Sequence, residues 1–145
     1  MNRSVSRERW RRLGRVALGA LYLTAAAFHL AKPQPFLGIM PGWVPWPGPV
    51  VFWTGLAEAA GALALLQPWS PGLRRAAAIA LALYAVCVYP ANLNHMLLDL
   101  AKADGGWGLG YHLPRLLAQP LLVWLALWSG RVIDWPWQVT EQPAP

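Results

Sequence analysis

The chain has 145 residues, of which 57% are hydrophobic and only 12% are charged, and its mean hydropathy is +0.34. Soluble domains carry about 25% charged residues, so this composition argues against a water-soluble fold and favours a protein embedded in lipid. The net charge of +6 comes largely from arginines in the first fifteen residues. We interpret them as a membrane-topology signal and expect no nucleic-acid partner. A single cysteine excludes an internal disulfide and a CxxC redox pair.

Four apolar stretches follow one another along the chain and are long enough to cross a bilayer, which takes about 17–25 helical residues. Helices are favoured because lipid cannot hydrogen-bond to a bare backbone. We therefore predict an all-α integral membrane bundle of four transmembrane helices, residues 13–131. A basic cytoplasmic segment, 1–12, precedes the bundle, and a cytoplasmic tail, 132–145, follows it, with a loose end at 138–145. The predicted spans are 13–31, 50–67, 73–98 and 113–130.

The basic residues predict the orientation of this bundle. Nine of the twelve fall on one side of the predicted membrane, and only Lys32, Lys102 and Arg115 fall on the other. Because basic residues accumulate in cytoplasmic segments, we expect both termini in the cytoplasm of a bacterial cell, with the bundle in the inner membrane. A cleaved signal peptide that ends near TAAA (24–27) is the alternative, and it would leave three spans.

The predicted outer loop, 32–49, is rich in proline and in large apolar residues. Its six prolines exclude a continuous helix. Its apolar side chains are Phe36, Ile39, Met40, Trp43 and Trp46, which are unusual in a free linker. We expect this loop to lie along the outer membrane surface and to cap the bundle.

Polar residues inside the second and third spans are candidates for a binding site. Glu58 lies in TGLAEAAG (54–61), where Gly55 and Gly61 allow another helix to approach closely. In the third span, Asn92, His95 and Asp99 have i, i+3, i+7 spacing and share one helix face. Pro90 precedes them and frees a backbone carbonyl one turn earlier.

The first and fourth spans add further polar residues. His29 closes the first span, and His112, Arg115 and Gln119 repeat the i, i+3, i+7 spacing in the fourth, where Pro120 frees another carbonyl. In the predicted orientation all of these residues lie in the outer half of the membrane. Because intramembrane polar groups usually face the bundle interior, we expect one polar site there, open to the outside.

The sequence leaves alternative roles for several of these residues. Glu58 and Arg115 are expected to form an ion pair, which is either part of the site or purely structural. Asn94, His95 and Asp99 are either site residues or wetted interface residues, and His29 is either a ligand or a locally bonded helix end. No HxxxH or HxxE spacing supports a metal site, so no metal ligands are assigned. Cys87 is expected to be a small buried hydrophobic residue.

Five short segments, in order, resemble the DoxX-like family of small membrane proteins. They are FHLAKPQPF (28–36), IMPGWVPWP (39–47), TGLAEAAGALALL (54–66), YPANLNHM (89–96) and HLPRLLAQPLLVWLALW (112–128). The resemblance implies a four-helix protein of the bacterial inner membrane. Some members of that family resemble the membrane subunit of thiosulfate:quinone oxidoreductase, and others are linked to thiol-redox complexes. The positions carried over by the resemblance are Glu58, Pro90, Asn92, Arg115 and Gln119.

These observations predict an accessory membrane subunit of a redox pathway that binds a quinone or another small ligand. The candidate ligand-binding residues are Glu58, Asn92, Arg115, Gln119, His29 and His95, with structural roles for Pro90, Pro120, Gly55 and Gly61. Quinone is a possible cofactor, and the lipid bilayer, a redox protein or a second copy of the chain are the expected partners. The alternatives are a quinone-coupled oxidoreductase in its own right and a small transporter or proton path.

Overall fold

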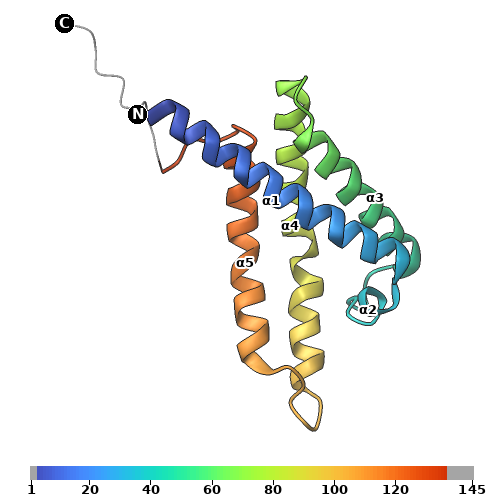
Figure 1. The fold of residues 1–145 in the computed structure, drawn as a ribbon. Helices are drawn as coiled ribbons and strands as arrows, with labels where there is room; N and C mark the ends of the chain where they lie inside the picture. The colour runs from blue at the N-terminus through green and yellow to red at the C-terminus, as the bar shows by residue number, and fades with distance from the viewer. Residues whose placement is uncertain (1–2, 137–145) are drawn as a thin grey trace, which may run out of the picture.

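The computed structural model describes residues 3–136, and all regular structure within them is helical (Figure 1). Four long helices coincide with the four predicted spans, and a short helix lies in the proline-rich loop. The first long helix begins at residue 3 and not at 13, so most of the basic segment forms the first turns of this helix. The helices are α1 (Arg3–Ala31), α2 (Gln34–Leu37), α3 (Pro47–Leu66), α4 (Pro71–Leu100) and α5 (Gly108–Ser129).

Three of these helices are long and apolar enough to cross a membrane: Val5–Ala31 of α1, all of α3 and all of α4. Only 28–33% of the residues in their most apolar windows are buried inside the molecule. Large side chains such as Leu63 and Leu83 are about 60% exposed. A surface this apolar is expected where lipid, and not water, covers it. Because α5 is not among the candidate spans, the fourth crossing remains a prediction.

Proline and serine set the starts of α3 and α4. Pro47 and Pro71 occupy the first turns, where a missing N–H has no intrahelical partner to lose. The Ser70 hydroxyl accepts a hydrogen bond from the Leu73 N–H at 3.2 Å and so caps α4. Trp46 has a positive φ of 47° and turns the chain from the loop into α3.

The helices pair as α1 with α3 and as α4 with α5, and contacts of α3 with α4 and of α1 with α5 join the two pairs. Figure 1 shows α4 and α5 running antiparallel, while α1 crosses them obliquely. The ends of α4 and α5 around residue 105 extend beyond α1 and α3 (Figure 1). The bundle is therefore tight at one end and reduced to a helical hairpin at the other.

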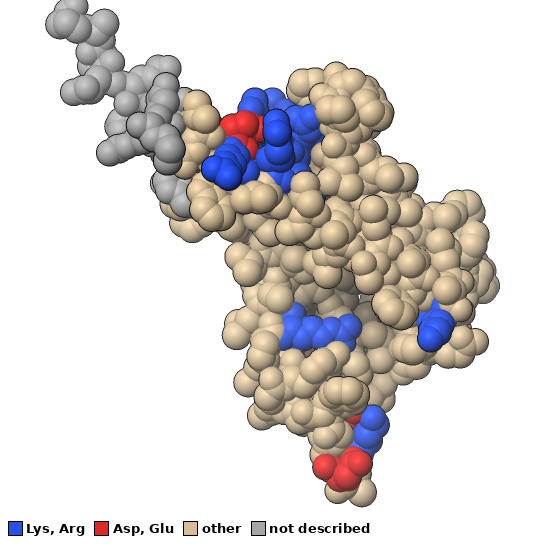
Figure 2. Space-filling view, in the orientation of Figure 1, with Lys and Arg blue, Asp and Glu red and all other residues tan. Residues whose placement is uncertain are grey.

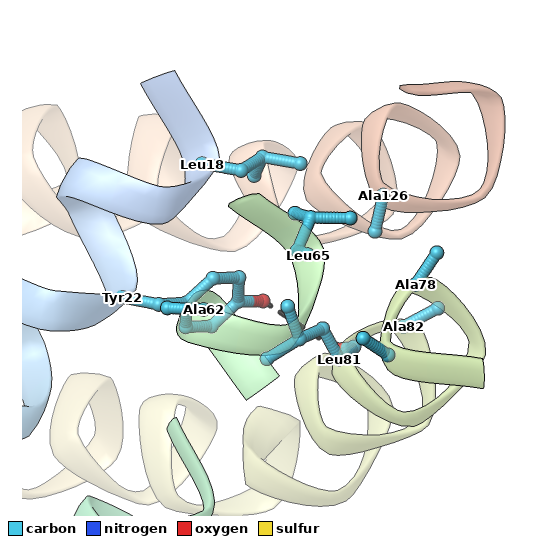
Figure 3. Packing of buried hydrophobic residues seen from close by; sticks show 9 residues of the cluster. Leu18, Tyr22, Ala62, Leu65, Ala78, Leu81, Ala82 and Ala126 are labelled. Carbon is cyan, nitrogen blue, oxygen red and sulfur yellow. Dashed lines mark hydrogen bonds between the residues drawn. The ribbon is translucent and has the colours of Figure 1, made fainter. Parts of the chain in front are cut away.

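All four long helices contribute to one apolar core, which Figure 3 shows. Glycines allow this close packing, as the sequence predicts. A Cβ added at Gly61 would lie 2.6 Å from Leu81 Cδ2, and one added at Gly55 would lie 2.8 Å from the Cβ of His29. The buried core residues are Leu18, Tyr22, Ala62, Leu65, Ala77, Ala78, Leu81, Ala82 and Ala126.

Charged side chains gather where α1 begins and α5 ends (Figure 2). Glu8 accepts hydrogen bonds from Arg15, at 3.0 Å, and from Arg131, and Arg11 pairs with Asp134. The first part of the predicted tail is therefore tied to α1 through Asp134, and the expected loose end, 138–145, is not among the described residues. Residues 137–145 lie outside the described part of the chain.

Candidate functional site

The polar residues predicted to form one site lie in separate places. His29 and Glu58 form a pair between α1 and α3. Gln119 borders a groove between α4 and α5. His95, Asp99, His112 and Arg115 form a group at the far end of α4 and α5, which we call the terminal cluster. The oblique course of α1 explains the separation, because α1 and α3 do not accompany α4 and α5 along their full length.

Glu58 pairs with His29 and not with Arg115, so the expected Glu58–Arg115 ion pair is wrong. The His29 Nδ1 lies 2.6 Å from the Glu58 Oε2, and the two side chains are 11% and 4% exposed. Gly55 precedes Glu58 by one helical turn and lets the backbone of α1 approach at His29. The Tyr84 hydroxyl lies beside the same carboxylate. The pair is therefore enclosed by three helices.

The proline-rich loop covers the His29 end of this pair. The ring of Phe36 lies against that of His29 with 3.7 Å between centroids and a tilt of 35° between the ring planes. The Asn94 amide donates a hydrogen bond to the Ile39 carbonyl at 2.9 Å and ties the loop to α4. Trp43 and Trp46 are 74% and 78% exposed, so they lie on the outer surface and do not cap the polar residues.

The groove between α4 and α5 lies where both helices contain an internal proline. Its volume is about 430 Å³, and its walls are almost entirely apolar. Each proline lacks an N–H, so α4 and α5 each lose one backbone hydrogen bond at this level. The groove is lined by Ala85, Val86, Tyr89, Pro90, Gln119, Pro120 and Val123.

Two buried amides near these prolines have unused hydrogen-bonding capacity. Gln119 is 8% exposed, and its Oε1 is fully buried without a hydrogen-bond partner in the described part of the chain. Asn92 is also 8% exposed, and its side chain makes no hydrogen bond to any residue between 3 and 136. Neither amide bonds to the carbonyls that the prolines free. Gln119 alone of the two borders the groove.

A larger hollow, of about 1000 Å³, lies between α1 and α5 at the basic end. It is lined by tryptophans and borders Pro136, where the described residues end. None of the predicted site residues faces it, and we assign no site there.

Asp99 is the centre of the terminal cluster. Its Oδ2 accepts the Trp107 backbone N–H at 2.6 Å and lies 2.9 Å from the His112 Nε2, while its Oδ1 accepts the Lys102 ammonium at 2.5 Å. Asp99 and His112 are each 1% exposed. The hydrogen bond to Asp99 raises the pKa of Lys102. Three partners thus hold a carboxylate that the bundle has removed from solvent.

A glycine in the α4–α5 loop makes this arrangement possible. Gly106 has a φ of +55°, and a Cβ there would lie 2.4 Å from the carboxylate of Asp99. Only glycine combines that backbone conformation with that approach. The loop can therefore close over Asp99 and bring the N–H of Trp107 to it.

Arg115 continues the terminal cluster toward the groove. Its guanidinium donates to the Nδ1 of His95 at 2.5 Å and lies 6.0 Å from the centre of the Tyr111 ring. Within residues 3–136, no carboxylate is within ion-pair distance of Arg115. The rings of His95 and His112 meet edge to face, with 4.9 Å between centroids.

The sequence indicated all of these polar residues but not how they pair. It named His29, Glu58, Asn92, His95, Arg115 and Gln119 as ligand-binding candidates, and it placed Asp99 and His112 in the same polar group without naming them as ligand-binding residues. The signal was the four-residue spacing of His95 and Asp99 on one helix, with His112 just after a short loop. Cys87 was expected to be buried and is exposed, because it lies on the outward face of α4 beside Val86.

Residues 18–131 match a protein family described as a domain of unknown function, DUF8561. The chain belongs to this family. No curated protein and no solved structure matches the chain. The part of the chain that matches DUF8561 runs from the middle of α1 to just beyond α5, so it includes the His29–Glu58 pair, the groove and the terminal cluster.

Proposed function

We propose that this protein is a four-span protein of the bacterial inner membrane that binds a quinone-like molecule in the α4–α5 groove, as an accessory subunit of a redox pathway. The observation that carries the proposal is the buried Oε1 of Gln119, which has no hydrogen-bond partner among residues 3–136 and belongs to a side chain that borders an apolar groove. The DoxX-like motifs of the sequence support a four-span topology and a redox context.

The chemistry of the groove suits a ring that bears carbonyl or hydroxyl groups. A buried acceptor without a partner costs about 1–3 kcal/mol, so a ligand that donates to Gln119 Oε1 recovers that free energy. The hydroxyl of a quinol is such a donor, and the carbonyl of a quinone can accept from the same amide. Small-molecule pockets typically measure about 300–1000 Å³ and combine apolar walls with few polar groups.

The groove is also placed where a lipid-soluble ligand could enter. Val86 in its wall is 58% exposed on the apolar outer face of α4, and Tyr89 is 38% exposed. Such a face contacts lipid in a membrane protein. A quinone dissolved in the bilayer would therefore reach Gln119 by moving sideways between the helices.

An accessory role fits the residues better than an independent thiol oxidoreductase. The single cysteine is exposed on α4 and cannot cycle a disulfide alone. Quinone-coupled electron transfer would then need a redox partner protein, which would dock on the bundle. A second copy of the chain is the other partner that we consider.

Binding of decylubiquinol and decylubiquinone to the detergent-purified protein tests this function. Gln119→Leu should weaken binding about tenfold, which corresponds to the loss of one hydrogen bond of about 1.4 kcal/mol. The same change should raise the melting temperature of the free protein, because it removes a buried acceptor without a partner. Equal affinity of variant and wild type for both compounds would contradict the proposal.

Two further variants serve as controls. Leu117 is 71% exposed on the outer face of α5, so Leu117→Ala should leave binding unchanged. Asn92 is buried but does not border the groove, so Asn92→Leu separates a groove-specific effect from a general effect of buried amides. If Asn92→Leu lowers affinity as much as Gln119→Leu does, the ligand occupies more than the groove.

A further inference from the structure

The terminal cluster combines two histidines and a carboxylate at the end of the α4–α5 hairpin. One ring nitrogen of His95, one of His112 and a carboxylate oxygen of Asp99 lie within 4.8 Å of one another. Asp99 and His112 are buried, and His95 is partly exposed. Imidazole nitrogens in such a group are suited to Zn²⁺ and similar divalent transition metals.

Of the two nitrogens of the His112 ring, only one has a partner within residues 3–136. Its Nε2 lies 2.9 Å from the carboxylate of Asp99, whereas its Nδ1 is buried and has no hydrogen-bond partner in the described residues. In a neutral ring that donates from Nε2, the Nδ1 holds a lone pair. A buried lone pair without a donor carries a free-energy cost that a bound metal ion removes.

Asp99 is placed as a carboxylate that orients a metal-binding histidine. Such residues commonly accept the other ring N–H of the histidine, which fixes its tautomer and its direction. The Trp107 N–H holds Asp99 in turn, and Gly106 makes that contact possible. We propose that His95 and His112 bind a divalent transition metal ion of the Zn²⁺ class, with Asp99 positioning His112 and supplying negative charge.

The position of the terminal cluster makes it accessible to an aqueous ion. A 30-residue helix such as α4 is about 45 Å long, which exceeds the hydrocarbon core of about 30 Å. The cluster lies at the end of α4 and α5 that extends beyond the other helices (Figure 1). This site is separate from the groove at Gln119 and does not depend on the quinone proposal.

Two positively charged side chains, Lys102 and Arg115, bond to residues of the terminal cluster. Lys102 bonds Asp99, but its side chain is 57% exposed and can turn into solvent. Arg115 donates to Nδ1 of His95 and competes with a metal for that nitrogen. Both side chains also repel a divalent ion, so their removal should strengthen metal binding.

Zn²⁺ titration of the tag-free, chelator-treated protein in detergent tests the site, with Co²⁺ absorption as a second readout. We expect one equivalent of Zn²⁺ per chain. His112→Ala and His95→Ala should each weaken Zn²⁺ binding at least tenfold. Asp99→Asn should weaken it about 10–100-fold, as is found for residues that hydrogen-bond to a metal ligand and orient it. Lys102→Met and Arg115→Leu should each tighten it several-fold.

Asp104 provides the matched control, because it is an exposed acid in the same loop. Asp104→Asn should leave Zn²⁺ affinity unchanged. Zn²⁺ should also raise the melting temperature of the wild type but not of folded His95→Ala. Unchanged affinity in His112→Ala, or the absence of stoichiometric binding in both the wild type and Lys102→Met, would overturn the proposal.

Discussion

At the scale of single residues, the position of Glu58 shows how backbone approach selects a partner. A carboxylate removed from water needs a compensating group, and a guanidinium would be the stronger one. Arg115 is nevertheless engaged by His95 and Tyr111 in the terminal cluster. Glu58 faces α1, where Gly55 admits His29. The local packing of two helices therefore decided the pairing, and charge strength did not.

The His29–Glu58 pair predicts a specific pattern of stability changes. Removal of one partner of a buried pair costs about 3–5 kcal/mol, because the other is left uncompensated. Glu58→Gln and His29→Leu should each lower the free energy of unfolding by that order, and the double variant should lose less than their sum. Denaturation in detergent, followed by circular dichroism, measures all three.

Arg115→Leu is the control for this cycle. It should add to Glu58→Gln without coupling, since Arg115 and Glu58 belong to different groups of contacting residues. A coupling free energy for Glu58 and Arg115 as large as that for Glu58 and His29 would contradict the described pairing.

At the scale of elements, small residues determine how closely the helices pack. Gly130 follows α5 and rests on Ala78 of α4, where an added Cβ would lie 2.1 Å from the Cβ of Ala78. An alanine Cβ cannot rotate away, so any adjustment there must move a helix. This contact joins the C-terminal end of α5 to the core.

Gly130→Ala should therefore destabilise the fold by about 1–3 kcal/mol, as other overpacking substitutions do. Gly72→Ala is a matched control, because nothing lies within 4 Å of a Cβ at that position in the first turn of α4. Thermal melting of the two variants in the same detergent compares them. Equal melting temperatures would mean that α5 can shift at no cost.

At the scale of the whole molecule, charge is unevenly distributed between the two ends. Figure 2 shows most basic side chains at the end where α1 begins, while Lys102 and Asp104 belong to the opposite loop. Basic residues accumulate on the cytoplasmic side of bacterial membrane proteins. We therefore expect the α4–α5 loop on the outer side, together with the terminal cluster.

Thiol labelling in whole cells measures this orientation. On a Cys87→Ala background, a cysteine introduced by Asp104→Cys should react with a membrane-impermeant reagent added outside. One introduced by Arg75→Cys should react only after the cells are permeabilised. Both positions are exposed, so burial does not limit either reaction. The opposite labelling pattern would reverse the proposed topology.

The sequence by itself determined the helical class, the places of the long helices and the polar residues within them. Apolar stretches of sufficient length can satisfy their backbone in lipid only as helices, and proline ends them or bends them. The close approaches at Gly55 and Gly61 also followed from local composition. These features depend on neighbours along the chain, so a sequence pattern contains them.

The partners of the polar residues were decided only by the tertiary structure. The spacing of Asn92, His95 and Asp99 places them on one face, but it does not say which helix covers which part of that face. The oblique course of α1 placed His29 beside Glu58 and left Gln119 beside a groove. The loop between α4 and α5 enclosed Asp99 together with His112. A crossing angle depends on contacts between distant segments, and such contacts have no periodic signature in one sequence.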